Sequence, residues 1–202
     1  MKKFLILTTY FAFFIPGHLV LAKEIALDNY IKSKWKLSKS QKKYLLSGEV
    51  LAQSQVVDNN NAQDFTMQVY AYHKKNCHKV IRKLSLLENY SQWVDFIKSS
   101  TYQANSHLFT LTADHPLLPF PMLIHIIVER PTKIGTYTFS FPTGIFRGLQ
   151  GHFEITEQNN RCLLFAKSHW QGQHTKIPNF IIELFSETLS KIGGHVLMRK
   201  VR

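Results

Sequence analysis

Histidine is the residue type in this sequence that first suggests a metal site. Ten are present, and nine of them follow residue 22. No histidine pair has the i, i+4 helical spacing with a glutamate that zinc hydrolases use. His125 with Glu129 and His152 with Glu154 are neighbours along predicted strands, where side-chain alternation directs each pair outward. We therefore predict no metal site from these nine, which are His73, His78, His107, His115, His125, His152, His169, His174 and His195.

Nucleophilic catalysis is the second chemistry to test. Asp114 and His115 precede Pro116, but the sequence has no G-x-S-x-G elbow or other nucleophile turn. Cys77 adjoins His78, yet sequence neighbours on a helix point about 100° apart, so this imidazole is badly placed to act as a base for the thiol. We predict no catalytic residue and no cofactor.

Cys77 and Cys162 are the only cysteines, and their spacing matches no metal motif. In an oxidising compartment two thiols either form a disulfide or stay buried as small apolar side chains. The sequence leaves both alternatives open, because it does not report whether the two Cα atoms come within bridging distance.

Residues 1–22 have the pattern of a cleavable secretory signal peptide. Two lysines stand near its start, residues 4–15 form an uncharged apolar run, Pro16 breaks that run, and the small side chain of Ala22 precedes the predicted cut. A transmembrane anchor is the alternative, since a spanning helix needs roughly 20 apolar residues and the uncharged stretch is about that long. We predict cleavage, and hence a periplasmic or secreted protein.

The chain is basic, with 25 Lys and Arg against 13 Asp and Glu and a formal net charge of +12. Removal of residues 1–22 takes away two lysines, which leaves 23 basic against 13 acidic residues, or +10. This balance favours anionic partners such as the head groups of a membrane surface, and a merely solvated basic surface is the alternative. Export makes nucleic acid the least suitable anion, so we expect no nucleic-acid partner.

Residues 23–45 form a basic arm with a short helix, followed by one domain at residues 46–202. The arm includes the sequence KSKWKLSKSQKK at residues 32–43. A membrane-surface element is one interpretation of lysines around a single tryptophan. A solvated arm that packs its tryptophan on the domain is the other.

The remaining chain alternates between the two-residue period of strands and the 3.6-residue period of helices. A hairpin is predicted first, then two short helices joined near residues 88–91, then a run of strands separated by Pro, Gly and Asn. Short links imply antiparallel neighbours, so the fold class is α+β. The predicted strands are 48–57, 65–72, 101–113, 122–129, 136–141, 145–156 and 161–170, and the predicted helices lie within 76–98 and at 176–197.

Three segments carry a resemblance to a known family, namely LLSGEVLAQS, the stretch VYAYHKKNCHKVIRKLSLLENYSQWVDFIKSSTY, and FRGLQGHFEIT with CLLFAKSHW and IPNFIIELFSETLSKI. Over residues 46–201 the chain resembles START-like proteins of the polyketide cyclase and lipid-transport (SRPBCC) superfamily. The resemblance implies a helix-grip fold, in which a curved antiparallel sheet wraps around a long C-terminal helix. It also implies a deep apolar cavity that holds a lipid, sterol, polyketide or other hydrophobic ligand.

The strand pattern predicts an unusually aromatic inner face for this sheet. Arg147 alternates with Leu149 and Phe153, which places its guanidinium on the cavity side to bind a polar head group, and Glu129 and Arg130 are further candidates for that role. A well-packed core is the alternative for the apolar residues, and a surface position is the alternative for Arg147. The predicted ligand-binding residues are Phe109, Tyr137, Phe139, Phe141, Phe153 and Arg147 on strands, Trp93 and Phe96 from the second helix, and Ile181, Leu184 and Phe185 from the last helix.

These features favour a periplasmic carrier that binds a hydrophobic molecule. A cyclase- or hydrolase-type enzyme that uses the same cavity is the first alternative, but it needs a convergent acid or base that the sequence does not reveal. An interaction protein with a closed cavity, docked through its basic arm on an anionic surface, is the second.

Overall fold

The computed structural model describes residues 27–59, 62–116, 118, 120–144, 146–174 and 177–201. The predicted signal peptide at residues 1–22 lies outside these residues. The chain divides into two compact units, Met1–Lys36 and Leu37–Arg202.

The described part of the first unit ends in a short π-helical turn, η1, at Ile31–Trp35. Lys36 terminates this turn in a left-handed conformation with φ of 52°. The Trp35 ring packs edge-on against Tyr30 with 6.3 Å between ring centroids, and the Lys34 ammonium lies 5.5 Å from the centre of the Tyr30 ring.

The second unit begins with the helix α2 at Lys39–Leu46. Ser38 starts it through a capping box: the Ser38 hydroxyl accepts from the Gln41 backbone N–H, and the Gln41 side chain accepts from the Ser38 backbone N–H. Leu45 is fully buried, whereas Lys39 and Lys43 are exposed. One side of α2 therefore packs on the hairpin that follows, and the other carries positive charge into solvent.

The strands of this unit form a single antiparallel sheet within the described residues. Its order is β1-β2-β8-β7-β6-β5-β4-β3, so β1 and β3 are the edge strands. Links between successive strands are short except where α3, η2 and α4 connect β2 to β3, as antiparallel neighbours require. The strands are β1 (Leu51–Asn59), β2 (Ala62–His73), β3 (Ile97–Gln103), β4 (Leu108–Ala113), β5 (Met122–Val128), β6 (Gly135–Ser140), β7 (Gln150–Gln158) and β8 (Arg161–Gln173).

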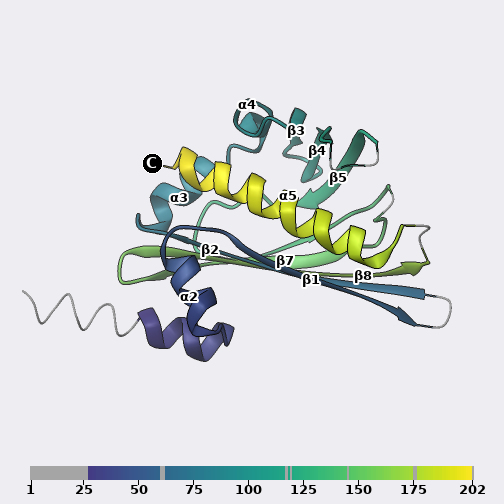
Figure 1. Ribbon diagram of the computed structural model, residues 1–202. Helices are drawn as coiled ribbons and strands as arrows, with labels where there is room; N and C mark the ends of the chain where they lie inside the picture. Colours follow the sequence, from purple (N-terminus) through teal and green to yellow (C-terminus); the bar gives the residue numbers. More distant parts are fainter. Residues whose placement is uncertain are drawn as a thin grey trace, which may run out of the picture. The chain divides into compact units, whose positions relative to one another are not determined.

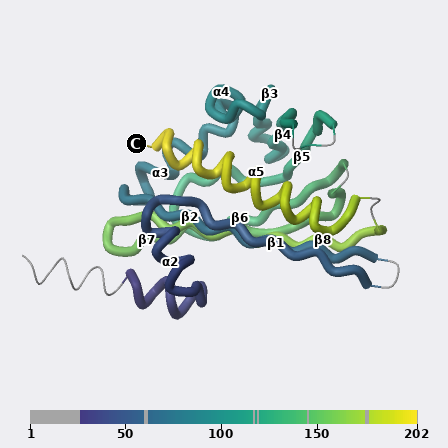
Figure 2. The backbone as a smooth tube through the Cα atoms, viewed as in Figure 1, coloured from purple at the N-terminus to yellow at the C-terminus, as the bar shows by residue number. Residues whose placement is uncertain are grey.

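The helix α5, at Asn179–Lys200, lies along the concave face of this sheet. In Figure 1 the yellow α5 runs obliquely, with β1, β2, β7 and β8 drawn on one side of it and α4, β3, β4 and β5 on the other. The backbone tube of Figure 2, in the same view, follows the same arrangement. The predicted α+β helix-grip fold, a curved antiparallel sheet around a long C-terminal helix, is confirmed. No helix in the described ranges has both the length and the apolar character needed to cross a bilayer.

Two glutamates attach α5 to the edge strand β1. The carboxylate of Glu183 accepts from the Val56 backbone N–H at 2.6 Å, and that of Glu187 accepts from the Ser54 backbone N–H at 2.8 Å. Residues four apart on a helix and two apart on a strand have similar spacings, so the pairs match in register. The helix thus satisfies edge N–H groups that would otherwise be open to another strand.

Gly193 and Gly194 lie within this helix in spite of the low helix propensity of glycine. A Cβ at Gly193 would come within 3.3 Å of Phe96 Cζ, and one at Gly194 would come within 3.1 Å of Val50 Cγ1. The two glycines let the C-terminal half of α5 approach its neighbours closely, and tertiary packing outweighs local propensity.

The structure joins Cys77 to Cys162 by a disulfide, the first of the two alternatives that the sequence leaves open. Cys77 is the first residue of α3, Cys77–Leu84, which Asn76 caps by accepting from the Lys79 backbone N–H. Both cysteines are fully buried. The bridge attaches α3 to β8 at one end of the sheet, where they share a core with Val80, Ile81, Tyr137, Ile155 and Val201.

Three predicted elements are wrong in detail. The predicted strand 101–113 is two strands, β3 and β4, because residues 104–107 form a turn that His107 closes with φ of 53°. The predicted strand 145–156 starts only at Gln150, because Gly148 has φ of +91° and precedes it in a turn. The second short helix is reduced to the 3-10 turn η2 at Leu87–Asn89 and a single helical turn, α4, at Tyr90–Trp93.

Candidate ligand-binding pocket

A pocket of about 450 Å³ lies between α5 and the concave face of the sheet. Its sheet side is made by Phe65, Met67, Val69, Leu111, Ala113, Ile124, Phe139, Leu149, Ala166 and Ser168, and its helix side by Ile182, Phe185, Ser186, Leu189 and Ser190. Pockets for small molecules typically measure about 300–1,000 Å³ and are mostly apolar. In size and in composition this pocket falls in that class.

Strand alternation explains the sheet side of the pocket. On β2, Phe65, Met67 and Val69 occupy alternate positions and all three line the pocket. The hydrophobic pattern of the sequence predicts these three on one face together with Ala71. Ala71 continues the row beyond the pocket and packs against Val50 and Met198.

A glycine on β7 leaves room for one of the pocket's aromatic rings. Gly151 pairs with Phe139 of β6, and a Cβ at Gly151 would lie 2.7 Å from Phe139 Cζ and overlap the carbonyl oxygen of Lys167. The absence of a side chain at this position allows the Phe139 ring to lie flat against the sheet and face the pocket.

The pocket opens between the loop before β5 and the loop between β6 and β7. Phe120 and Leu123 line it and are 52% and 60% exposed, and Thr143 and Gly144 also line it and are exposed. Gly144 adopts φ of +88°, a conformation that favours glycine. Phe120 therefore places a large, exposed apolar side chain at the rim, whereas Leu123 alternates with the inward Ile124 along β5 and directs its side chain to the outer face.

Comparisons with known proteins bear on the fold. A scan against protein-family models and a search of curated proteins find no match. Solved structures do match: a START superfamily protein from Mycobacterium smegmatis is 13% identical with a TM-score of 0.54, covering 67% of this chain and 96% of that protein. The protein Ara h 8.0201 is 9% identical with a TM-score of 0.54, covering 68% and 97%. The protein XoxI from Bacillus cereus is 15% identical with a TM-score of 0.50, covering 66% and 94%.

The chain has a START-like fold. At these identities the likeness concerns the fold alone. The predicted resemblance to START-like proteins is thereby confirmed, whereas the use of the START-like pocket depends on this chain's own residues.

Four of the predicted ligand-binding residues line the START-like pocket: Phe96, Phe139, Phe141 and Phe185. They come from the start of β3, from β6 and its end, and from α5. Their contact with a ligand stays a prediction.

Four other predicted residues belong to packed core rather than to the pocket. Tyr137 stacks on Phe153 with 5.1 Å between ring centroids and 13° between ring planes, and its hydroxyl donates to the Lys133 carbonyl at 2.8 Å. Phe109 packs edge-on against Tyr90 at 5.7 Å, and Trp93 is half-buried beside the same ring. All four take the packed-core alternative that the sequence leaves open, since the same aromatic side chains fill a core and line a cavity. Their contact with a ligand stays a prediction.

Arg147 does not reach the pocket. It lies in the turn between β6 and β7, its side chain is exposed, and its carbonyl accepts from the Trp170 indole N–H at 3.1 Å. The prediction relied on strand alternation from Phe153 and Leu149, but the strand begins only at Gln150. Alternation therefore does not extend to residue 147, and Arg147 takes the surface position that the sequence leaves as the alternative.

On α5, two of the three residues predicted to line the pocket, Ile181 and Leu184, do not line it. Ile182 lines the pocket, whereas Leu184 is 53% exposed and Ile181 is half-buried outside the pocket. Phe180 is 65% exposed, so the first turns of α5 carry apolar side chains on both faces. Such a pattern has no clear polar side, and for that reason it did not fix the rotation of the helix.

The sequence pattern did not predict the rim or the hydroxyls of the pocket. Leu118, Phe120 and Leu123 line it, and the apolar character of HPLLPFP at residues 115–121 was the available signal. Ser168, Ser186 and Ser190 also line it. A serine within an otherwise apolar face is a weak signal, because serine is equally common on surfaces.

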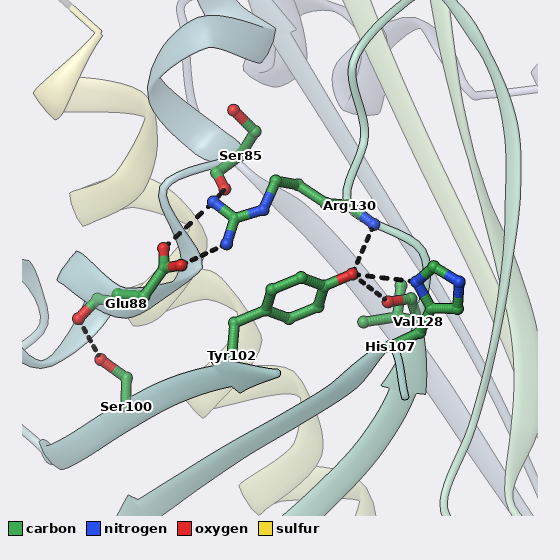
Figure 3. Close-up of polar contacts among 7 residues, drawn as sticks. All are labelled: Ser85, Glu88, Ser100, Tyr102, His107, Val128 and Arg130. Carbon is green, nitrogen blue, oxygen red and sulfur yellow. Dashed lines mark hydrogen bonds and ion pairs between the residues drawn. The ribbon is translucent and has the colours of Figure 1, made fainter. Parts of the chain in front are cut away.

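A polar cluster outside the pocket, drawn in Figure 3, holds the connection between α3 and α4. The guanidinium of Arg130 pairs with both carboxylate oxygens of Glu88, donates to the Ser85 carbonyl at 2.9 Å, and lies 4.5 Å from the centre of the Tyr102 ring. Through its hydrogen bond Arg130 holds the pKa of the Glu88 carboxyl below its usual value. Arg130 thus connects η2 to the end of β5, and the contacts of its guanidinium are structural.

The Tyr102 hydroxyl completes this cluster. It accepts from the Arg130 backbone N–H at 3.1 Å and donates to the Val128 carbonyl at 3.2 Å. Ser100, on the same strand, donates to the Glu88 carbonyl at 2.8 Å. Each member has a partner within the cluster, so we interpret it as a structural clamp.

Proposed function

We propose that this protein is a carrier that binds one hydrophobic molecule in the START-like pocket. The supporting observation is the pocket itself, about 450 Å³ of space that is largely apolar inside and apolar at its rim. An empty apolar cavity costs stability, because the side chains around it lose the contacts that a close-packed core would give. A ligand with a matching apolar surface restores those contacts.

The polar groups that face the pocket fit a carrier protein better than they fit an enzyme. Among the lining side chains that the structure describes, the polar ones are the hydroxyls of Thr143, Ser168, Ser186 and Ser190, together with Lys167. The cyclase or hydrolase alternative needs a positioned acid or base. Lys167 is exposed and alternates along β8 with the inward Ala166 and Ser168, so it directs its ammonium away from the pocket.

The proposal includes export and exchange at an anionic membrane surface. The signal-peptide pattern of residues 1–22 supports export. Six lysines without an acidic residue at positions 32–43 support attraction to anionic head groups, which is worth about 1 kcal/mol per lysine near the surface. The exposed Phe120 provides an apolar side chain at the mouth of the pocket, where a ligand could pass from the membrane into the protein.

A matched pair of tryptophan substitutions on α5 tests the binding. Leu189→Trp places an indole in the pocket, whereas Leu184→Trp places the same group on an exposed position of the same helix. We expect Leu189→Trp to weaken binding of the fluorescent probe diphenylhexatriene at least about tenfold, since overfilling a cavity excludes its ligand. Leu184→Trp should bind like the wild type, and equal binding by both variants would refute the pocket as the site.

Export is tested by the N-terminus of the protein recovered from outside the cytoplasm. Cleavage after Ala22 yields a chain that begins at Lys23. Intact-mass measurement distinguishes this product from the full chain. A full-length protein retained in the membrane fraction would instead support the anchor alternative.

A further inference from the structure

Charge is distributed unevenly between the surface of this protein and its pocket. The sequence carries a net charge of +12, yet Lys167 is the single ionisable residue among the described residues that line the pocket, and it is exposed on the outer face of β8. Arg147, the residue that the sequence pattern predicts to bind a polar head group, is exposed in the turn between β6 and β7. The described interior of the pocket therefore has no side chain that could pair with an anion.

Besides Thr143 in the loop after β6, the side-chain hydroxyls that line the described part of the pocket come from two facing elements, β8 and α5. Ser186 and Ser190 are four residues apart on α5 and thus neighbours on one side of the helix. Ser168 lies on β8 opposite Met67, its partner on β2. Ser190 Oγ lies 3.9 Å from Met67 Sδ, which brings the hydroxyls of the helix and of the sheet to the same stretch of the pocket.

The bond between Ser190 and Met67 is weak, because a thioether sulfur is a poor acceptor. A ligand oxygen would be a better acceptor for the Ser190 hydroxyl. A hydroxyl can both donate and accept, so this group of serines suits a ligand hydroxyl, ketone or ester equally well. It does not suit a carboxylate or phosphate, whose transfer into an apolar site without a countercharge costs far more than one or two neutral hydrogen bonds return.

We propose that the pocket selects an uncharged lipid: an apolar molecule whose polar group is a neutral alcohol, carbonyl or ester bonded by Ser168 and Ser190. This inference rests on the proposed function and specifies its ligand class. The basic surface then attracts the protein to an anionic membrane, while the pocket takes a neutral component out of it. Surface and pocket recognise different molecules.

Three fluorescent probes of similar apolar character separate the ligand class from binding itself. They are cis-parinaric acid, its methyl ester, and diphenylhexatriene, which has no polar group. With the purified protein near neutral pH, we expect the ester to bind at least about tenfold more tightly than the acid, because the acid must bury a carboxylate. Equal or tighter binding of the acid, with diphenylhexatriene still bound, would overturn the inference and leave the proposed function standing. Failure of all three to bind would overturn both.

Substitutions test the role of the hydroxyls. Ser168→Ala combined with Ser190→Ala should weaken ester binding about fivefold relative to diphenylhexatriene, the loss expected for one neutral hydrogen bond. Ser106→Ala, on the exposed turn between β3 and β4, is the matched control and should leave the ratio unchanged. Unchanged ratios in both variants would remove the serines from the proposal.

The position of a charged head group is tested at Arg147. If an anionic head group stays at the mouth of the pocket, Arg147→Ala weakens binding of parinaric acid and not of its ester, a result that would contradict selection of uncharged ligands. If the pocket selects as proposed, Arg147→Ala changes neither, and Ser186→Arg raises the affinity for the acid relative to the ester by giving the carboxylate a partner.

Discussion

The two ends of the concave face use the same side chains for opposite purposes. At the α3 end, Tyr137 of β6 stacks on Phe153 above the buried disulfide and the space is filled. Two residues further along the same face of β6, Phe139 lines the pocket, and Phe141 beyond the strand lines it too. One strand therefore passes from a solid core to a cavity without a change in residue type.

The difference comes from what covers each end of the sheet. The α3 end is covered by a helix fixed through Cys77 to β8 and by the C-terminal turns of α5, which Gly193 and Gly194 bring close to the sheet side. At the pocket, α5 contributes Ile182, Phe185 and Leu189, and two loops contribute Leu118, Phe120 and Thr143 in place of a second helix. In this protein the filled and the hollow part of the concave face thus differ in the elements that cover them.

Removal of the disulfide should give the largest loss of stability in the molecule. The bridge closes a sequence separation of 85 residues. In the chain-entropy account a loop of this length contributes about 4–5 kcal/mol to the free energy of unfolding. We expect Cys77→Ala with Cys162→Ala to lower that free energy by roughly this amount in urea denaturation.

The control for the disulfide lies at the other end of the sheet. Leu123→Ala removes a side chain that is 60% exposed on the outer face of β5. Its expected cost is less than about 0.5 kcal/mol, as for most surface substitutions. Similar losses for the two changes would show that the ends do not differ in the way described.

Two aromatic truncations on or next to β6 compare the filled end with the hollow end directly. Tyr137→Ala should cost about 3–5 kcal/mol, the usual range for a large aromatic residue in a packed core. Phe141→Ala should cost about 1–2 kcal/mol, because part of its ring already faces the pocket. Thermal or urea unfolding measures both, and an equal cost would argue that the pocket is closed in solution.

The clamp between Glu88 and Arg130 should have the smallest effect, and a pH-dependent one. Arg130 lowers the pKa of Glu88 in the folded protein, so the pair stabilises the fold above the unfolded-state value of about 4.5 and loses this effect as the pH falls through the folded-state pKa. The Glu88 side chain is 44% exposed, which limits the contribution to less than about 1 kcal/mol.

Glu88→Gln removes the titrating group of this clamp. We expect a small loss of stability at neutral pH that disappears in acid below the folded-state pKa, measured as the difference in unfolding free energy between variant and wild type across the pH range. A difference that stays constant with pH would assign the effect to packing rather than to charge.

The fold followed from the sequence because its signals are long and repeated. Alternation along Phe65, Met67 and Val69 placed β2, and the apolar period of residues 176–197 placed α5. Local turns were harder to predict: residues 104–107 join β3 to β4 without a glycine or proline, and Gly148 delays β7. The pattern of one strand does not report where its neighbour turns.

An apolar pocket could be predicted from the sequence, but only some of the residues that line it could be. An aromatic inner face foretells either a core or a cavity, and Phe109 and Phe139 look alike in sequence although one is core and the other pocket wall. The rotation of α5 was ambiguous because Phe180 and Leu184 extend the apolar pattern onto the exposed side. The location of the protein outside the cytoplasm, predicted from the signal-peptide pattern, stays a prediction.

Native mass spectrometry of the protein purified from its own compartment shows whether the pocket carries a bound molecule. We expect a species heavier than the chain by one small molecule, which organic solvent releases and which proves to be an uncharged lipid. Leu189→Trp, prepared in the same way, should carry none. A wild-type protein that has the mass of the chain alone, with a solvent extract identical to that of Leu189→Trp, would contradict the account.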